Sequence, residues 1–278
     1  MRAGLLQINA SDDPAANLPQ TLSLMDRAVD QGATFIFTPE VTNLISTSRT
    51  HQRSVLCHQA DDPTLAALRD RATKHGVWLN IGSLALKTSD PDGRFANRSF
   101  LISPAGDIAA TYDKIHMFDV AVNAQETYRE SAGYRPGDHS ALAQTDHGAL
   151  GLTICYDMRF PNLYRHLAQA GAQLITVPSA FSPVTGVAHW HSLLRARAVE
   201  TGAFIIAAAQ TGDHSISRGK PRSTYGHSLA VNPWGEVILD AGPTPGAHIC
   251  DINLAEVALA REKIPALSHD RSYKIVAQ

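Results

Sequence analysis

Short apolar runs of strand type alternate with amphipathic stretches of helical type along most of this chain. Apolar residues that recur every three or four positions indicate a helix, and short apolar runs bounded by turn residues indicate strands. In the stretch 17–33, for example, one helical face carries Leu18, Leu22, Met25 and Val29. Strands and helices in alternation are typical of the α/β class, in which helices cover the faces of a sheet.

The alternation predicts a similar set of elements in both halves of the chain. The first half is predicted to hold the strands 4–9, 34–38 and 77–86, the helices 17–33 and 63–75, and a hairpin of 98–103 with 107–112. The second half is predicted to hold the strands 149–154, 173–178, 204–209, 228–232, 237–240 and 247–252, and the helices 161–170, 187–201 and 254–263. Hairpins combined with helical crossovers indicate mixed sheets with helices on their outer faces. Because no low-complexity linker divides the 278 residues, we expect one domain over 1–278.

The charge balance and the cysteines exclude several classes of protein. A formal net charge of −2 gives no electrostatic reason to expect a nucleic acid or an anionic membrane as partner. The three cysteines, Cys57, Cys155 and Cys250, form no CxxC pair, so neither a disulfide framework nor a thiolate zinc site is predicted. The apolar run at the start is too short for a signal peptide, and no run reaches the ~18 apolar residues of a membrane helix. We therefore expect a soluble, cytoplasmic protein.

The segment GLTICYDMRFP, residues 151–161, places Cys155 where a buried strand ends and the chain turns toward a helix that opens at Pro161. Side chains at such strand ends face a crevice in α/β sheets, so the position suits a nucleophile. A free cysteine is also among the most buried residue types, so the position equally suits a structural thiol. Position alone leaves both interpretations open.

A nucleophilic cysteine needs a group that accepts its proton, because a thiol with a pKa of ~8.5 is mostly protonated at neutral pH. None of the 13 histidines is marked out by its context, and no G-x-S-x-G elbow of a serine hydrolase is present. Two other strand-type runs are followed by a charged residue, namely Glu40 in FIFTPEVTN and Lys114 in ATYDKIHMF. Each alone is typical of a solvated surface residue. Together with Cys155 they predict a reactive site, provided that the three strands are neighbours.

The motifs FTPEVTN, YDKIHMFD and ICYDMRFPNLYRHLAQAGAQLITVPSAF contain these three residues and resemble the motifs of the nitrilase, or carbon–nitrogen hydrolase, superfamily. The segments AHWHSLLRARAVETGAFIIAAAQTG, YGHSLAVNPWGEVI and REKIPALSHDR extend the resemblance, in order, over nearly the whole chain. Within the superfamily the chain resembles most closely the branch of amidases that act on deaminated glutathione, with the omega-amidases nearby.

The resemblance implies a four-layer α-β-β-α sandwich of two pseudo-symmetric halves, with the active site between the sheets, and pairing of protomers into a homodimer or higher homo-oligomer. It implies that Glu40 acts as general base, Cys155 as nucleophile, and Lys114 with the backbone N–H of Tyr156 as oxyanion donors. The expected reaction hydrolyses the amide of a small, acidic substrate and releases ammonia through a cysteine thioester. It has no role for a metal or an organic cofactor.

The resemblance also suggests roles for residues near this triad. The family has a second glutamate between its lysine and its cysteine, and YRESAGYRPGD points to Glu130, rather than Glu126, as the residue that holds Lys114 and orients the substrate amide. Arg159 is expected to clamp a substrate carboxylate, with a structural ion pair as the alternative. Tyr156, Phe181 and Thr185 are expected to line the pocket.

Two further features leave alternatives open. The basic stretch 211–225, with Arg218, Lys220 and Arg222, is either a solvated loop or a lid that binds substrate. His189 and His191 lie two apart on a predicted helix, so they face different directions and make a poor metal pair.

Other reactions of the superfamily share the triad. An omega-amidase acting on α-keto-acid amides, an N-carbamoyl or nitrile hydrolase, and an acyl transferase all remain possible on this ground. A non-catalytic scaffold of the same fold is disfavoured because all three triad residues are present.

Overall fold

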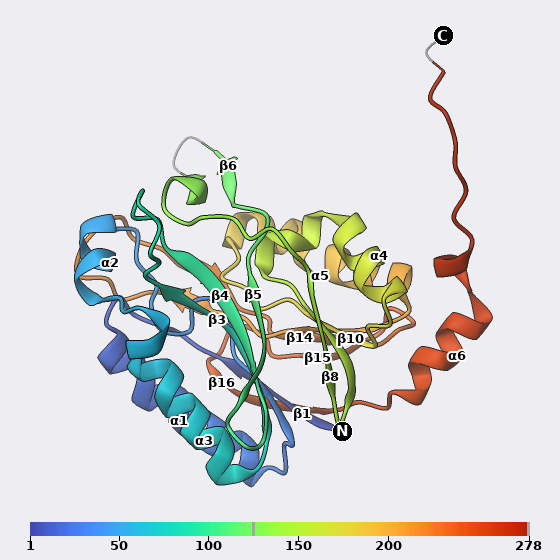
Figure 1. Cartoon of the computed structure of the whole chain (residues 1–278), viewed down its shortest axis with the longest axis horizontal. Coiled ribbons are helices and arrows are strands. Elements are labelled where there is room, and N and C mark those ends of the chain that lie inside the picture. Colours follow the sequence, from blue (N-terminus) through green and yellow to red (C-terminus); the bar gives the residue numbers. More distant parts are fainter. Residues whose placement is uncertain (124–125, 277–278) are drawn as a thin grey trace.

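The computed structural model describes residues 1–123 and 126–276, and it arranges them as two main sheets with helices on their outer sides (Figure 1). The first sheet is built from β1 (Arg2–Gln7), β2 (Phe35–Phe37), β3 (Trp78–Leu86), β4 (Ala96–Ile102), β5 (Ile108–Asp113) and β16 (Gly246–Asp251). The strand order is β16-β1-β2-β3-β4-β5. Strands β1, β2 and β3 run parallel, whereas β16, β4 and β5 pair antiparallel with their neighbours, so the sheet is mixed, as predicted.

The second sheet has the order β15-β14-β11-β10-β9-β8. Its strands are β8 (Ala141–Thr145), β9 (Gly148–Leu152), β10 (Leu174–Thr176), β11 (Phe204–Ala207), β14 (Leu229–Val231) and β15 (Val237–Asp240). Here β9, β10 and β11 are parallel to one another, and the remaining pairs are antiparallel. A parallel centre with antiparallel edges thus occurs in both halves of the chain.

Four helices cover the two sheets, and each begins with a proline, a residue whose fixed φ suits the first helical position. They are α1 (Pro14–Asp30), α3 (Pro63–His75), α4 (Pro161–Gln169) and α5 (Pro183–Thr201). The carboxylate of Asp13 accepts the backbone N–H of Ala15 and caps α1, and Asp62 caps α3 in the same way through Leu65. Helices α1 and α3 pack on the first sheet, and α5 packs on the second beside α4. Two further helices are α2 (Arg49–Val55) and α6 (Ala255–Lys263).

The apolar core lies on both sides of the first sheet. Buried side chains of one face, including Leu5, Phe35 and Phe37, belong to the same cluster as Leu150 and Leu152 of the second sheet. Side chains of the other face pack with buried residues of α1 and α3, among them Met25 and Leu68. The alternation of side chains along each strand supplies both faces. The predicted α-β-β-α sandwich is therefore confirmed.

The elements differ from the prediction in several short elements and in the bounds of two helices. Helix α2 and strand β8 were not predicted, and α1 spans Pro14–Asp30 instead of 17–33. The stretches predicted to be irregular, 115–140 and 211–225, hold two small hairpins, β6 (Asp119–Ala121) with β7 (Thr127–Arg129) and β12 (Thr211–Asp213) with β13 (Ser223–Tyr225). Strands of three residues are too short to show a period of two. Helix α5 begins at Pro183, four residues before the predicted start, because Pro183 opens the helix and Gly186 weakens the helical pattern there.

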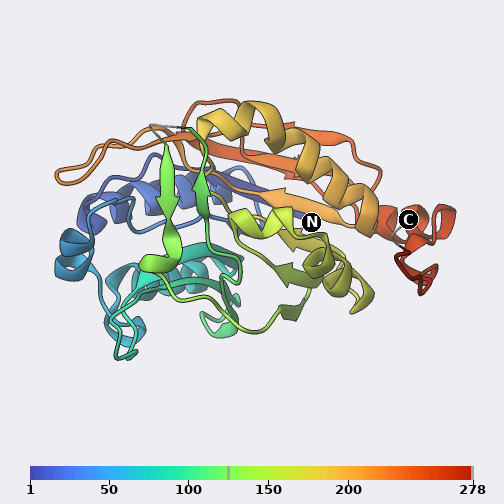
Figure 2. The ribbon, with the colours of Figure 1, turned by 90° about the horizontal axis from the view of Figure 1, so that it is seen from above.

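The chain after β16 leaves the two sheets. Helix α6 still packs on the main body, because its buried Val257 belongs to the core and Arg261 donates to the carbonyls of Thr201 and Ala172. The residues from 271 to 276 extend away from the main body (Figures 1 and 2). Within the described residues, no helix combines the length and the apolar character needed to cross a membrane.

Candidate active site

A cavity of about 650 Å³ opens where the strand ends of the two sheets meet, and it brings together residues from distant parts of the sequence. Glu40 follows β2, Lys114 follows β5, and Cys155 follows β9. Glu130, in a one-turn 3₁₀ helix after β7, joins them in the lining of the same cavity. The condition that the three strand ends be neighbours is met.

The ammonium group of Lys114 lies between two carboxylates. Its Nζ donates to Oε1 of Glu40 at 2.8 Å and to Oε2 and Oε1 of Glu130 at 2.8 and 3.1 Å. Lys114 is 2 % exposed and Glu40 is 4 % exposed, so water does not screen this arrangement. Glu130, the less certain of the carboxylates expected from sequence, therefore occupies the position beside Lys114.

Neutral groups complete the hydrogen bonds of both carboxylates. The side-chain amide of Asn97 donates to Glu40 at 2.9 Å and to Glu130 at 3.2 Å. The backbone N–H of Ala180 donates to Oε2 of Glu40 at 2.8 Å, and that of Phe118 donates to Oε2 of Glu130 at 2.6 Å. Sequence reasoning missed Asn97, because an asparagine inside a strand pattern carries no motif.

Tight backbone turns present the side chains of Glu40 and Cys155. Cys155 has a φ of 48° and Val41, next to Glu40, has a φ of 46°. Non-glycine residues rarely adopt such values, and they cluster at functional sites. The Cys155 N–H donates to the carbonyl of Pro178 at 2.9 Å, which fixes the turn. Gly82 of β3 passes so close to the Thr38 carbonyl that a Cβ there would clash with it at 2.1 Å.

The buried carboxylate of Asp157 joins the turn of the nucleophile to the segment that carries Lys114. It accepts the N–H of Ile154 at 2.9 Å and the hydroxyl of Tyr112 at 2.7 Å. It also accepts the N–H of His116 at 3.0 Å, and the Nδ1 of that residue lies 2.7 Å away. Asp157 thus holds together two strand ends that are far apart in sequence.

The electrostatics of the cluster determine which group holds the proton. Burial acts to raise the pKa of Glu40, but the charge and hydrogen bond of Lys114, together with the interactions of Cys155 and the Ala180 N–H, hold that pKa below its usual value. Burial acts to lower the pKa of Lys114, yet the charges of Glu130 and Glu40 hold it well above its usual value. Burial and then the charge of Glu40 raise the pKa of Cys155, against the opposing effect of Lys114. A protonated thiol therefore lies beside an ionised carboxylate.

The charge of Lys114 does not make Cys155 a thiolate. Lys114 does act to lower the pKa of the Cys155 thiol, but the net shift of that pKa is upward. Glu40 and the Cys155 thiol interact directly, and each shifts the pKa of the other. The thiol consequently depends on the carboxylate to remove its proton, and the cation alone does not generate a thiolate.

Three of the four predicted pocket residues line the cavity, and the fourth, Arg159, does not. Tyr156, Phe181 and Thr185 line the cavity, with Thr185 in the first turn of α5. Arg159 is absent from the lining. Its guanidinium lies 5.8 Å from the ring centroid of Tyr156 and 5.7 Å from that of Phe181, and its Nη2 is 3.2 Å from Nδ1 of His189. Arg159 therefore packs against two residues of the cavity lining without belonging to the lining itself.

Other cations occupy the position expected for Arg159. Arg49, Arg129, Lys220 and Arg222 line the cavity, and none of them has a carboxylate within ion-pair distance among residues 1–123 and 126–276. The stretch 211–225 is held against the first half of the chain rather than solvated along its whole length. Lys220 N–H donates to the Thr47 hydroxyl, and that hydroxyl is 3.1 Å from the Lys220 carbonyl.

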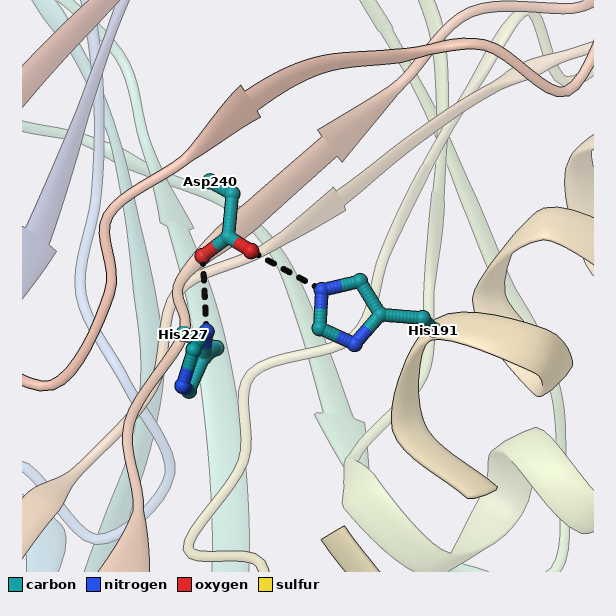
Figure 3. Close-up of side chains that lie close together, drawn as sticks. All are labelled: His191, His227 and Asp240. Atoms are coloured by element: carbon teal, nitrogen blue, oxygen red, sulfur yellow. Dashed lines mark hydrogen bonds and ion pairs between the residues drawn. The ribbon is translucent and has the colours of Figure 1, made fainter. Parts of the chain in front are cut away.

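In the described part of the chain, one group of side chains has the composition of a metal site, and it lies outside the cavity lining. Asp240 of β15 lies between His191 of α5 and His227 (Figure 3). One nitrogen of each imidazole ring lies 2.9 Å from an oxygen of the Asp240 carboxylate. The Trp190 indole also donates to the His227 carbonyl at 2.8 Å. These contacts satisfy the carboxylate and fasten α5 to the β14–β15 hairpin.

Comparisons with known proteins agree with this geometry. A family model described as carbon–nitrogen hydrolase matches residues 2–262. The deaminated glutathione amidase of Yersinia enterocolitica is 37 % identical over 268 residues, which cover 96 % of this chain and 92 % of that protein. Nit3 of Saccharomyces cerevisiae, a member of branch 10 of the nitrilase superfamily, matches with a TM-score of 0.83 at 26 % identity over 97 % of this chain and 96 % of that one. The NitFhit protein of C. elegans matches with a TM-score of 0.88 at 33 % identity, and 97 % of this chain covers 65 % of that longer chain.

Proposed function

The chain belongs to the carbon–nitrogen hydrolase family of the nitrilase superfamily, and from this premise we propose that it is an amidase for small acidic substrates, with deaminated glutathione as the leading candidate. The observation that carries the proposal is the carboxylate of Glu40, which is ionised, bonded to Lys114 at 2.8 Å, and lines one cavity together with the thiol of Cys155. Relatives 35–37 % identical over nearly the whole chain are named deaminated glutathione amidases.

The first half of the reaction forms a thioester. Glu40 takes the proton of the Cys155 thiol as the sulfur attacks the amide carbon. The Nζ of Lys114 and the backbone N–H of Tyr156 donate to the oxyanion of the tetrahedral intermediate. The protonated Glu40 then gives its proton to the departing nitrogen, and the C–N bond breaks.

The second half hydrolyses the thioester. Glu40 takes a proton from water, the water oxygen attacks the thioester carbon, and the acid leaves as Cys155 regains its proton. Glu130 keeps Lys114 charged and in place through both halves. The Oδ1 of Asn97 is buried without a partner among the described residues, and it is an acceptor for the N–H of the substrate amide.

The chemistry of the substrate corrects the expectation that ammonia is released. In deaminated glutathione the amide nitrogen belongs to cysteinylglycine, so that dipeptide is the leaving group. Ammonia leaves only when the substrate is a primary amide, as for an omega-amidase. Both reactions use the same thioester and yield the same α-keto diacid when the acyl group is the same.

The acidic character of the substrate is supported by the charges of the cavity. The cavity lining contains five cationic side chains, including Arg49, Arg129 and Arg222, but only three carboxylates. Two of the carboxylates, Glu40 and Glu130, are bonded to Lys114. The positive charge that remains favours a substrate with carboxylates of its own.

The remaining proposals concern assembly and location. We propose that the whole chain forms one domain. We also propose that it forms a homodimer, because α5 exposes the apolar side chains Val184, Val187 and Val199. Sedimentation velocity tests the dimer. The three cysteines are unpaired, which supports a reducing, cytoplasmic location.

A substrate panel tests the function. The panel contains deaminated glutathione, the α-keto-acid amides of glutamine and asparagine, an N-carbamoyl amino acid and an aliphatic nitrile, with acid production measured for each. We expect the highest kcat/KM for deaminated glutathione and none for any substrate with Cys155→Ala. A higher kcat/KM for the keto-acid amides would assign an omega-amidase. Preference for the nitrile or the N-carbamoyl compound would reject the proposal.

A further inference from the structure

Besides the acceptor Oδ1 of Asn97, two polar atoms in the cavity lining that can donate have no hydrogen-bond partner among the described residues. They are the Oγ of Ser182 and the Nε of Arg222, and both are buried. Buried polar groups in folded proteins nearly always have a partner, so a pair without one in the same cavity requires an explanation. The Nε of Arg222 can only donate and the hydroxyl of Ser182 can donate, so one acceptor group in the cavity can satisfy both atoms.

Ser182 stands at the N-cap of α5, where a serine hydroxyl normally accepts an N–H of the first turn. Here the hydroxyl makes no capping hydrogen bond, and the residue is only 5 % exposed. Pro183, Val184 and Thr185 of that first turn also line the cavity. The N-terminus of a 19-residue helix, with its unsatisfied N–H groups and partial positive charge, therefore opens on the cavity.

Arg222 is fixed next to the same segment. Its Nη2 donates to the carbonyl of Ala180 at 2.9 Å, two residues before Ser182, and its guanidinium lies 5.5 Å from the ring centroid of Tyr128. The N–H of Ala180 in turn donates to Glu40. The guanidinium is thus held close to the base by a defined geometry, and it keeps its charge without a carboxylate from the described residues.

The carboxylates of the cavity do not supply the missing acceptor. Glu40 and Glu130 bind Lys114, and Glu126 accepts the hydroxyl of Tyr128 at 2.8 Å. A guanidinium, a free hydroxyl and a helix N-terminus that face one space form the donor set that binds a carboxylate.

We propose that Ser182, Arg222 and the N-terminus of α5 form the subsite for the keto-acid carboxylate of the substrate, an inference that rests on the amidase function proposed above. The hydroxyl of Ser182 and the Nε–H of Arg222 donate to its two oxygens. This carboxylate belongs to the acyl part, which deaminated glutathione and the ω-amides of α-keto acids have in common. The role expected of Arg159 from sequence then belongs to Arg222.

Three variants and a matched pair of substrates test the subsite. Ser182→Ala and Arg222→Gln each remove one donor, and Arg218→Gln removes the same charge from an exposed position of the same loop outside the cavity lining. The substrates are the ω-amide of an α-keto diacid and the same amide with its carboxylate replaced by a methyl group. For the acidic amide we expect KM to rise about ten- to hundredfold in Arg222→Gln and a few-fold in Ser182→Ala. For the methyl analogue, and for both amides in Arg218→Gln, we expect KM within a factor of two of the parent enzyme.

Two further measurements separate this subsite from a structural role and from the leaving group. The rate at which iodoacetamide alkylates Cys155 must stay unchanged in Ser182→Ala and Arg222→Gln, because neither donor touches the thiol. An amide whose only carboxylate is on the leaving amine must be affected no more than the methyl analogue. Equal losses on the acidic and the methyl substrates, slower alkylation, or a loss confined to the leaving-group carboxylate would each overturn the subsite. If the parent enzyme hydrolyses no acidic amide, the proposed function fails instead.

Discussion

Replacing Glu40 with Gln tests the assignment of the base and produces two effects of opposite sign. The substitution keeps the shape of the side chain and removes both its charge and its basicity. In the parent protein, Glu40 accepts three hydrogen bonds, from Lys114, Asn97 and Ala180, at 2.8 to 2.9 Å. An amide has one oxygen and one NH₂ group, so its nitrogen must face at least one of these donors.

The size of each effect follows from these contacts. Loss of a general base costs about 100- to 10,000-fold in kcat, or about 3 to 5.5 kcal/mol in the activation barrier. The donor that faces the new amide loses its acceptor, which costs about 1 to 3 kcal/mol of folding stability. The charge of Glu40 raises the pKa of the Cys155 thiol, so Glu40→Gln lowers that pKa. We therefore expect alkylation of Cys155 to begin at a lower pH while turnover almost disappears.

The assay measures kcat with an acidic amide and, in parallel, the rate of iodoacetamide alkylation between pH 6 and 10. Glu126→Gln is the matched control, because Glu126 lines the same cavity but bonds to Tyr128 instead of Lys114. That control should keep kcat within a factor of about three and leave the alkylation profile in place. A Glu40→Gln variant that retains more than a tenth of the parent kcat, or whose thiol titrates at a higher pH, would refute the assignment.

Four other perturbations have defined outcomes. Cys155→Ser should abolish turnover and leave the melting temperature nearly unchanged, and activity lost through alkylation of Cys250 with Cys155 intact would contradict this. Lys114→Met should lower kcat about 100- to 1000-fold, slow the alkylation of Cys155 and cost about 3 to 5 kcal/mol of stability, because Glu40 loses its buried counter-charge; unchanged alkylation would restrict Lys114 to the oxyanion. Arg159→Lys should lower kcat/KM equally for charged and uncharged amides, since Arg159 lies outside the cavity lining; a loss confined to acidic amides would restore its predicted role. Burial acts to raise the pKa of Asp240, but the hydrogen bonds of the Gly242 N–H, His191 and His227 hold that pKa below its usual value of 3.8. Asp240→Asn should therefore cost about 1 kcal/mol of folding stability at neutral pH, since this group is partly exposed. The difference in melting temperature between Asp240→Asn and the parent should vanish as pH falls through the lowered pKa, and a constant difference down to pH 2 would show another cause.

The local patterns of the sequence were sufficient for the class of fold and for naming Glu40, Lys114 and Cys155 as candidates. Periodicity and proline positions are properties of neighbouring residues, so helix α3 and strand β15 have the predicted bounds. A reactive residue that directly follows an apolar run is also a local feature, and it marks the end of a strand. The match of several ordered motifs to a family adds the four layers, because homologous chains bury the same pattern of residues.

The relations between distant residues were decided by the tertiary structure alone. The sequence offers Arg159 as an anion clamp and Arg222 as part of a basic loop, and only packing places Arg159 against the ring of Phe181, outside the cavity lining, and Arg222 in that lining. The protonation of Cys155 likewise depends on burial and on Glu40 and Lys114, which are distant in sequence. Ser182 resembles an ordinary helix cap until the structure shows that its hydroxyl has no partner among the described residues. Burial and electrostatic interaction act through space, and separation along the chain does not specify separation in space.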